Sequence, residues 1–280
     1  MPSEPSTFIV VPQWQGSVSP RAMRLSDGAE AIRGDLPGSR TRTVEVPAEA
    51  GDAMETGINR FSSLRLVRQR MDTALHDASG IPLTIGGDCG VSLAAVENAA
   101  RRHPGDLALV WFDAHPDLHD PGSSPSGGFS GMVLRAIMGD GIDGLHLQGD
   151  AVVPAARVVL AGVRDIEEPE AELITQRGIA NVPVDGVESR ATLTDAVRAT
   201  GSAHVYLHID LDVLDPSALT GLANPLPFGA SVEALTGAIT ALRSEFTLAG
   251  ATLAGFAPAS ADAADTDLPS ILRILGALTK

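Results

Sequence analysis

Several residue types are scarce in this chain, and each scarcity excludes a class of protein. Cys89 is the only cysteine among 280 residues, so no disulfide can form within the chain and a reducing compartment is allowed. Basic residues number 20 against 35 acidic ones, which gives a net charge of −15. Because such a chain repels phosphate groups, we expect neither nucleic acids nor anionic membranes as partners.

Long hydrophobic runs are also missing. No segment approaches the roughly 20 uninterrupted apolar residues that a membrane span needs. The N-terminal stretch MPSEPSTFIVVPQW lacks the basic start and apolar run of a secretory signal. Hydrophobic residues still make up 44% of the chain, which is enough for a sizeable core, and nothing resembles a long linker. We therefore expect one domain, residues 1–280, in the cytoplasm.

Short apolar and β-branched runs alternate with helical patterns. Strands are predicted at TFIVV, TVEV, LTIGG, LALVWF, RVVLAGV, VYLHIDLDV and TLAGFA, and helices at 59–79, 91–103, 167–178, 192–200, 231–246 and 268–279. This alternation is typical of parallel crossover units. The sequence therefore predicts an α/β fold, with a mostly parallel sheet of about eight strands and helices on both faces. Ligands bind such sheets beyond the carboxyl ends of the strands.

The run HVYLHIDLDVLDP ends a predicted strand with two acidic residues. Asp210 and Asp212 are two positions apart, so their carboxylates face the same way. Like charges held together in partly buried surroundings are costly unless a cation lies between them. The pair therefore indicates a divalent metal ion; the alternative is a strand end whose acids face water.

A second strand end, LALVWFDAHPDLHD, carries three ligand-type side chains. Asp113, His115 and Asp117 occupy alternate positions directly after an apolar run. Oxygen and imidazole donors together suit manganese, iron, cobalt, nickel or zinc, and the carboxylate majority favours the harder ions. An acidic cluster on a solvated loop is the alternative.

The third strand end, LTIGGDCGVS, places Cys89 at the head of the predicted helix 91–103 after a turn that Gly86 and Gly87 permit. A helix N-terminus lowers the pKa of a thiol and makes the thiolate available as a ligand, although a lone cysteine is more often a small buried apolar residue. If the three strand ends meet, they supply six ligating groups. That number suits two ions bridged by carboxylates better than one catalytic ion with an open position.

These three motifs, in this order, resemble those of the ureohydrolases: arginases, agmatinases and formimidoylglutamases. GGDCGVS is similar to the family's Gly-Gly-Asp-His motif, FDAHPD to Asp-Ala-His-x-Asp, and HIDLDVLDP to Asp-x-Asp-x-x-Asp-Pro. SGGFSGM, 126–132, resembles the family loop Ser-Gly-x-x-His-Gly-Met. The resemblance implies a three-layer α/β/α fold, a centre of two manganese ions whose bridging hydroxide attacks a guanidinium-type carbon, and a homo-oligomer.

Carried onto this sequence, the resemblance assigns a role to each of the six ligands. Asp113 and Asp210 would bridge the two ions. Asp117 and Cys89 would complete one ion, and His115 and Asp212 would complete the other. Asp117 would also accept the first proton, because it lies beside the hydroxide.

Three positions depart from the family pattern. Cys89 replaces a histidine ligand, Ser130 replaces a histidine thought to shuttle protons, and Gly255 replaces a glutamate that pairs with the guanidinium of the substrate. A substrate with less positive charge suffers less from the loss of that glutamate. With these three changes the sequence resembles the Nω-hydroxy-L-arginine hydrolases of D-cycloserine biosynthesis, which form hydroxyurea and L-ornithine. In such an enzyme Ser130 would position a water molecule that relays protons.

Further positions match the family's contacts to the amino-acid part of the substrate. Ser126 corresponds to a serine that contacts the α-carboxylate, and His119 replaces an asparagine that assists it. Glu167 and Glu170 fall near the acidic contacts to the α-amino group. The alternative is that these two glutamates are solvated residues in the first turn of a helix.

The expected partner is therefore a small guanidino amino acid. A second reading is hydrolysis of another guanidine or formimidoyl compound, such as arginine, agmatine, guanidinobutyrate or formimidoylglutamate. A third, of a different class, is an inactive ureohydrolase scaffold retained for oligomeric regulation. The acidic pair Glu167 and Glu170 favours a substrate with an α-amino group, and the retained ligand set favours a working enzyme.

Overall fold

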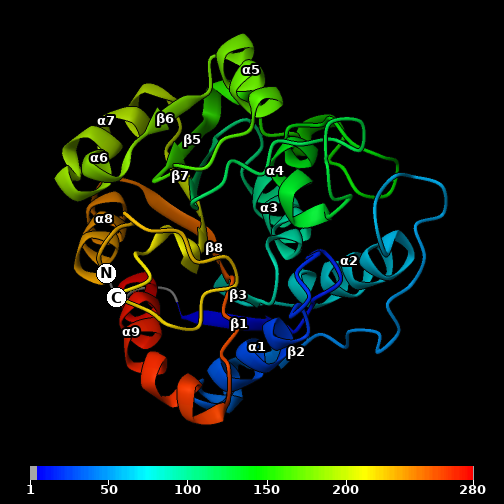
Figure 1. Cartoon of the computed structure of the whole chain (residues 1–280). Helices are drawn as coiled ribbons and strands as arrows, with labels where there is room; N and C mark the ends of the chain where they lie inside the picture. The colour runs from blue at the N-terminus through cyan, green and yellow to red at the C-terminus, as the bar shows by residue number, and fades with distance from the viewer. Residues whose placement is uncertain (1–4, 280) are drawn as a thin grey trace.

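A sheet of eight parallel strands forms the centre of the protein in the computed structural model, which describes residues 5–279 (Figure 1). The strands lie in the order β2-β1-β3-β8-β7-β4-β5-β6, and every adjacent pair is parallel. Their bounds are β1 Ser6–Val11, β2 Thr41–Thr43, β3 Ile81–Gly86, β4 Leu107–Phe112, β5 Val158–Ala161, β6 Ala180–Val182, β7 His204–Asp210 and β8 Thr247–Ala254. The predicted α/β fold is confirmed; the predicted domain range also included residues 1–4 and 280, which lie outside the described part.

Helices cover both faces of this sheet (Figure 1). One apolar core joins the sheet to α2 Phe61–His76, α3 Ser92–Arg102, α4 Val133–Ile137 and α5 Glu168–Arg177. The other core joins it to α1 Arg24–Gly34, α6 Val184–Ser189, α7 Ala191–Ala199, α8 Val232–Glu245 and α9 Ala261–Thr279. Within residues 5–279 we find no helix with the length and apolarity to cross a membrane.

The alternation of side chains along β4 and β7 decides what faces the site. Leu109 and Trp111 belong to the core on the α3 side, whereas Val110 and Phe112 belong to the opposite core. Asp113 follows Trp111 by two positions and so continues the row on the α3 side. The same alternation puts Asp210 on this side of β7.

Some elements were missing from the sequence prediction. Helices α1, α4 and α6 and strand β6 were not predicted. Strand β6 has three residues, of which only Val182 is buried, so it shows no alternation to detect. The two short helices α4 and α6 offer too few turns for a helical period to be recognised.

Three predicted boundaries were wrong. β2 lies at Thr41–Thr43 rather than at TVEV, 43–46. β8 runs from Thr247 to Ala254 rather than over 252–257, because Gly255 has a φ of 84° and leaves the extended region. Helix α9 begins at Ala261 and continues through Pro269, since its apolar face is buried against the sheet on both sides of the proline.

Candidate metal centre and active site

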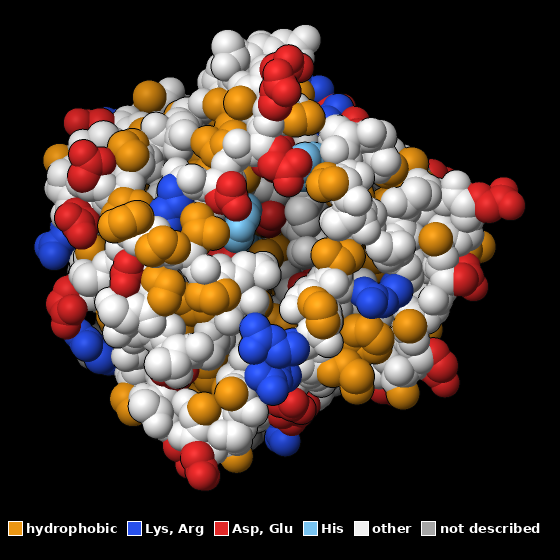
Figure 2. Space-filling model, in the orientation of Figure 1, with side chains coloured by type: hydrophobic (Ala, Val, Ile, Leu, Met, Phe, Trp, Pro, Cys, Tyr) orange, Lys and Arg blue, Asp and Glu red, His pale blue; other side chains and the backbone are white. Residues whose placement is uncertain are grey.

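The three predicted strand ends converge on one cavity beyond the carboxyl edge of the sheet. Figure 2 shows acidic and histidine side chains gathered in a hollow on this face. The cavity has a volume of about 170 Å³, which admits a small molecule but no folded partner. All six candidate ligands line it: Cys89, Asp113, His115, Asp117, Asp210 and Asp212.

Asp88 fixes the backbone on which Cys89 is presented. Its buried carboxylate accepts hydrogen bonds from the Gln13 side chain and from the backbone N–H groups of Gly16 and Gly90, each at 2.9 Å. A Cβ at Gly87 would lie 1.8 Å from the carbonyl oxygen of Gln13. This glycine therefore serves a close backbone approach, rather than the turn dihedral that the sequence suggested.

The candidate ligand atoms form two groups that share one carboxylate. The atoms offered by Cys89, Asp113, Asp117 and His208 lie within 4.8 Å of one another, and so do those of Asp113, His115 and Asp212. Such spacings suit an ion held about 2.0–2.6 Å from each ligand. Asp113 is the only residue of both groups among those described.

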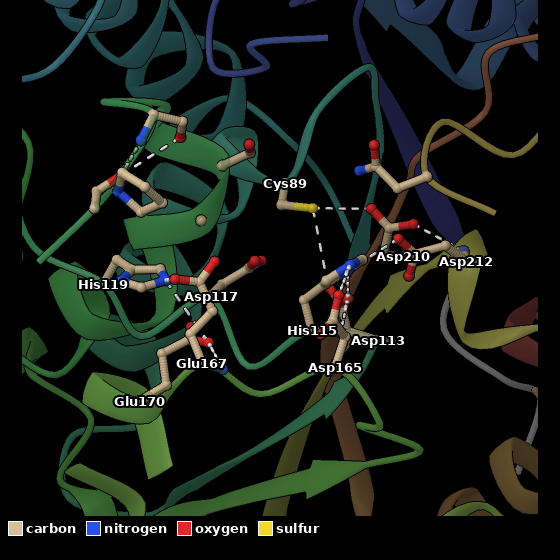
Figure 3. Close-up of a pocket in the computed structure, with 16 residues that line it drawn as sticks. Cys89, Asp113, His115, Asp117, His119, Asp165, Glu167, Glu170, Asp210 and Asp212 are labelled. Atoms are coloured by element: carbon tan, nitrogen blue, oxygen red, sulfur yellow. Dashed lines mark hydrogen bonds and ion pairs between the residues drawn. The ribbon is translucent and has the colours of Figure 1, made fainter. Parts of the chain in front are cut away.

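Asp210 stands beside the first group without belonging to it. Its Oδ2 lies 2.9 Å from the sulfur of Cys89, and its Oδ1 accepts a hydrogen bond from the Asp212 N–H at 2.8 Å. The Cys89 sulfur is 4.0 Å from Oδ2 of Asp113 (Figure 3). Asp210 therefore lies between the thiol and the turn that carries Asp212.

The second group is organised by His115. Its Nδ1 lies 3.3 Å from Oδ1 of Asp113 and 3.2 Å from Oδ2 of Asp212. The other Asp212 oxygen accepts a hydrogen bond from the Ala114 N–H at 3.0 Å, and Arg164 donates to the Asp212 carbonyl at 2.7 Å. These bonds join the ends of β4 and β7 and hold His115 between two buried carboxylates.

The crowded carboxylates perturb one another. Burial, reinforced by Asp212 and Asp113, raises the pKa of Asp210, and burial with Asp113 raises that of Asp212 to about 6. For Asp113, burial is outweighed by contacts with His115 and His208, which lower its pKa. Contacts with Asp113 and Asp212 outweigh the effect of burial on His115 and raise its pKa to about 12. A divalent cation between these groups would favour the ionised carboxylates.

The predicted lowering of the Cys89 pKa is wrong for the free protein. Burial raises this pKa well above its ordinary value, and the carboxylates of Asp210, Asp117 and Asp113 raise it further. Helix α3 begins only at Ser92, after a single tight turn over Cys89–Val91. The thiol is therefore protonated unless a cation shares the site, because a coordinating thiol loses its proton.

Asp117 has a strained backbone and a free oxygen. Its φ is 51°, and its carbonyl accepts hydrogen bonds from the backbone N–H groups of Leu134 and Arg135. Its buried Oδ2 has no hydrogen-bond partner. Burial, then Asp113, raises the pKa of Asp117 well above the ordinary value. A buried carboxylate that no protein donor satisfies fits a metal ligand.

Acidic residues and a histidine form the other end of the cavity (Figure 3). Nε2 of His119 lies 3.5 Å from Glu167 and 3.7 Å from Glu170. Glu170 accepts hydrogen bonds from the backbone N–H groups of Leu118 and Glu167, so it caps helix α5 as well as lining the cavity. Glu167 is half exposed and faces the opening, which leaves it available to a ligand.

The loop 126–132, which resembles a loop of the ureohydrolases, lines the cavity. Ser126 and Ser130 both face the cavity. Asn59 holds the loop through a side-chain bond to the Ser126 carbonyl at 2.8 Å and a backbone bond to the Gly127 carbonyl at 2.8 Å. The Ser130 N–H donates to the Gly16 carbonyl, which fixes its position near the metal ligands.

Gly255 lies behind the candidate ligands rather than in the cavity lining. A Cβ at this position would lie 2.1 Å from Oδ1 of Asp210, closer than real Cβ atoms approach. Its φ of 84° disfavours any other residue. The backbone here thus excludes a side chain of any size unless Asp210 moves.

Three residues of the site were missed in the sequence analysis. His208 reaches the first ligand group from within β7, and Asp165 and Asn224 line the cavity. Asp165 lies 3.8 Å from Nε2 of His115. His208 did carry a signal, since it shares a strand face with Asp210 two positions later; Asn224 carried none.

Metal binding is expected to release protons. Asp117, Asp210 and Cys89 all have raised pKa values, and each must ionise to ligate. Groups with raised pKa values are protonated at low pH, so the affinity for Mn²⁺ should rise with pH, and through about pH 6 where Asp212 loses its proton. Calorimetric titration in two buffers of different ionisation enthalpy measures the protons released. An affinity independent of pH would contradict this expectation.

Comparison with known protein families gives one match over most of the chain. A model described as the arginase family matches residues 17–271. Arginase of Staphylococcus aureus (strain COL) is 28% identical over 190 residues, which cover 64% of this chain and 63% of that arginase. The N(omega)-hydroxy-L-arginine amidinohydrolase of Streptomyces lavendulae is 31% identical over 211 residues, or 73% of each chain.

A solved structure shows the same fold. Entamoeba histolytica arginase in complex with L-ornithine superposes with a TM-score of 0.84 over 99% of each chain, at 20% sequence identity. At this identity the similarity bears on the architecture alone.

Proposed function

This chain belongs to the arginase family, and from that premise we propose that it hydrolyses Nω-hydroxy-L-arginine to hydroxyurea and L-ornithine. Water would add to the guanidino carbon, and the bond from that carbon to the δ-nitrogen would break. The products leave as hydroxyurea and the free amine of ornithine. In this proposal the enzyme serves D-cycloserine biosynthesis.

Gly255 is the observation that carries the choice of substrate. The family resemblance places a guanidinium-pairing glutamate at this position, and the local backbone leaves no room for it. A fully cationic guanidinium would lose a charge-assisted bidentate pair here. The hydroxyl of Nω-hydroxy-L-arginine lowers the basicity of its guanidine, so the same loss costs this substrate less. The similarity to the Streptomyces lavendulae amidinohydrolase supports the same choice.

The charge pattern of the cavity supports a guanidino amino acid. Glu167 and Glu170 at one end suit an α-amino group, and Ser126 and His119 on adjacent parts of the wall suit an α-carboxylate. Five candidate metal ligands lie at the other end, namely Cys89, Asp113, His115, Asp210 and Asp212, and Asp117 lies toward His119 (Figure 3). A substrate bound between the two ends would have its guanidino carbon beside the ligands.

In this proposal the six predicted ligands would hold two manganese ions, and Asp113 and Asp210 would be the carboxylates shared by both. When bound, the ions would activate water for attack on the guanidino carbon and stabilise the charge that develops. Asp117 would accept a proton from the attacking water through its buried Oδ2, which has no hydrogen-bond partner in the protein. Ser130 orients a relay water that carries the proton toward the leaving amine.

The test is ornithine release from manganese-loaded protein. We expect kcat/KM for Nω-hydroxy-L-arginine to exceed that for L-arginine by at least about 10-fold, equivalent to about 1.4 kcal/mol of transition-state stabilisation. Equal or reversed preference would make the protein an arginase with unusual ligands. No release from either, with the ions bound, would favour another guanidine or formimidoyl substrate, and a protein without bound ions would favour an inactive scaffold.

Cys89→His is expected to change the substrate ratio. A neutral imidazole in place of a thiolate removes one negative charge and makes the ion a stronger Lewis acid. We expect the preference for the hydroxylated substrate over arginine to fall by about 10-fold. The ratio of the two kcat/KM values measures this, with Cys89→Ser as the comparison that removes the thiolate without adding an imidazole. A ratio unchanged in Cys89→His would remove the cysteine from substrate selection.

The oligomeric state and the cellular location of the protein are two further predictions of this proposal. A homo-oligomer follows from the family resemblance, and light scattering of the purified protein would measure its mass. A cytoplasmic location is also proposed, and cell fractionation would check it.

A further inference from the structure

His208 is a buried histidine with one ring nitrogen unaccounted for. Its side chain has 0% exposure and stacks on Trp111 with ring centroids 3.5 Å apart and planes 14° apart. Nδ1 lies 2.7 Å from the hydroxyl oxygen of Ser92. Nε2 has no hydrogen-bond partner. A buried polar atom without a partner lowers the stability of the fold, so Nε2 is expected to bind a group that the protein itself does not supply.

The free nitrogen faces the first group of candidate metal ligands. Nε2 lies 3.7 Å from Oδ2 of Asp113, and the ligand atoms of His208, Asp113, Cys89 and Asp117 all fall within 4.8 Å of one another. The distance to Asp113 is too long for a hydrogen bond, yet it is ordinary for two atoms bound to one ion.

The fold explains why an imidazole arrives here from a strand interior. His208 and Asp210 are two positions apart on β7 and therefore point to the same face of the sheet. Trp111 pairs with His208 in the register of β4 and β7, and its ring fixes the plane of the imidazole. The ring can thus reach the first group of candidate ligands although its backbone lies within the sheet.

We propose that Nε2 of His208 is a ligand of the ion held by Cys89, Asp113 and Asp117. This inference rests on the proposed function, because it needs the metal centre. Nδ1–H donates to the Ser92 hydroxyl, which selects the tautomer whose Nε2 carries a lone pair. With Asp210 shared between the two ions, this ion then has one sulfur, one nitrogen and three carboxylate ligands, and its set is softer than that of the ion beside His115.

The opposite tautomer defines the competing arrangement. There the Ser92 hydroxyl donates to Nδ1, and Nε2–H faces the Asp113 carboxylate. His208 would then be a positioning residue that touches no ion. The two arrangements differ in one measurable property, which is whether a metal–nitrogen bond forms.

Nuclear magnetic resonance of the cadmium-loaded full chain tests this directly. The probe is a spin-active isotope of Cd²⁺ together with isotope-labelled histidine nitrogens. We expect scalar coupling of cadmium to two imidazoles, from His115 and His208. His208→Gln should keep only the His115 coupling, and His204→Gln, at the other end of the same strand, should keep both. Coupling to His115 alone in the unmodified protein would overturn the proposal without any variant having to fold.

A second measurement uses the hydrogen bond that holds the ring. Ser92→Ala should weaken Cd²⁺ binding by about 10- to 100-fold, as expected when the partner of a metal-bound histidine is lost. Ser202→Ala removes an equally buried hydroxyl that has no hydrogen-bond partner and should leave the affinity unchanged. Equal affinities for the Ser92 and Ser202 variants would count against the proposal. A chain that binds no Cd²⁺ would overturn the metal centre itself, and His208 with it, whereas bound Cd²⁺ without His208 coupling overturns only the role of His208.

Discussion

Asp113→Asn is expected to remove both metal ions and to lower kcat/KM for Nω-hydroxy-L-arginine by about 1,000-fold or more, because metal-ion catalysis supplies several kcal/mol of transition-state stabilisation. Asp113 is the residue shared by the two ligand groups. One of its oxygens faces His115, and the other faces Cys89 and His208. An amide keeps the shape of the carboxylate but loses its charge, so both ions would lose one of their two shared carboxylates. Metal content by elemental analysis and turnover by ornithine release measure the two effects.

Asp267→Asn is the matched control for this variant. Asp267 is also buried, at 4% exposure, but it lies outside the cavity and accepts hydrogen bonds from Thr220 and Gly221. Its replacement should lower the thermal midpoint while the metal content and turnover stay close to those of the unmodified protein. Full metal content and turnover in Asp113→Asn would remove Asp113 from the centre.

The strand ends were predictable because of the geometry of parallel sheets. Asp113, Asp210 and Cys89 each follow an apolar run, and the carboxyl ends of parallel strands lie along one edge. The sequence therefore predicted that Cys89 and Asp210, which are 121 positions apart, lie close together. The distance of 2.9 Å between the Cys89 sulfur and Oδ2 of Asp210 confirms this. The alternation of strands and helices along the chain is sufficient to predict this convergence, because it places the strands in parallel.

The electrostatics of the site was not predictable in the same way. The head of a helix suggested a lowered pKa for Cys89, but burial and three carboxylates raise it. Those terms depend on distances between residues on different strands, and no local pattern encodes them. His208 was missed although its spacing from Asp210 placed it on the same strand face, since a histidine inside an apolar strand is interpreted as packing until the candidate ligands beside it are placed.

The backbone at Gly255 gives this position a role that the sequence did not predict. From the sequence it was a missing glutamate, whose loss was expected to weaken the binding of a fully cationic guanidinium. The structure adds a φ of 84° and the carboxylate of Asp210 2.1 Å from the position of a Cβ. A glutamate introduced at position 255 is therefore predicted to displace Asp210, a candidate metal ligand, rather than to pair with the guanidinium of the substrate.

Gly255→Glu is expected to gain no arginine hydrolysis and to lose at least about 100-fold in kcat/KM for Nω-hydroxy-L-arginine, since displacement of a group around the metal typically costs 10- to 100-fold and a left-handed backbone adds about 1–2 kcal/mol of strain. Gly255→Ala should show most of this loss, because the collision begins at Cβ. Metal content and both kcat/KM values are the measurements. A variant that hydrolyses arginine well would mean that the backbone at 255 adapts and that Asp210 keeps its place.

Gly201→Ala separates the two causes of that loss. Gly201 has a φ of 73°, close to that of Gly255, but no atom lies within 4 Å of its added Cβ. The strain of a left-handed backbone is therefore common to both alanine variants, while the collision with Asp210 belongs to Gly255 alone. We expect Gly201→Ala to lower the free energy of unfolding by about 1–2 kcal/mol and to leave metal content and kcat/KM unchanged. If both variants lost stability equally and neither lost metal, the close approach of Gly255 to Asp210 would have no part in holding the ligands.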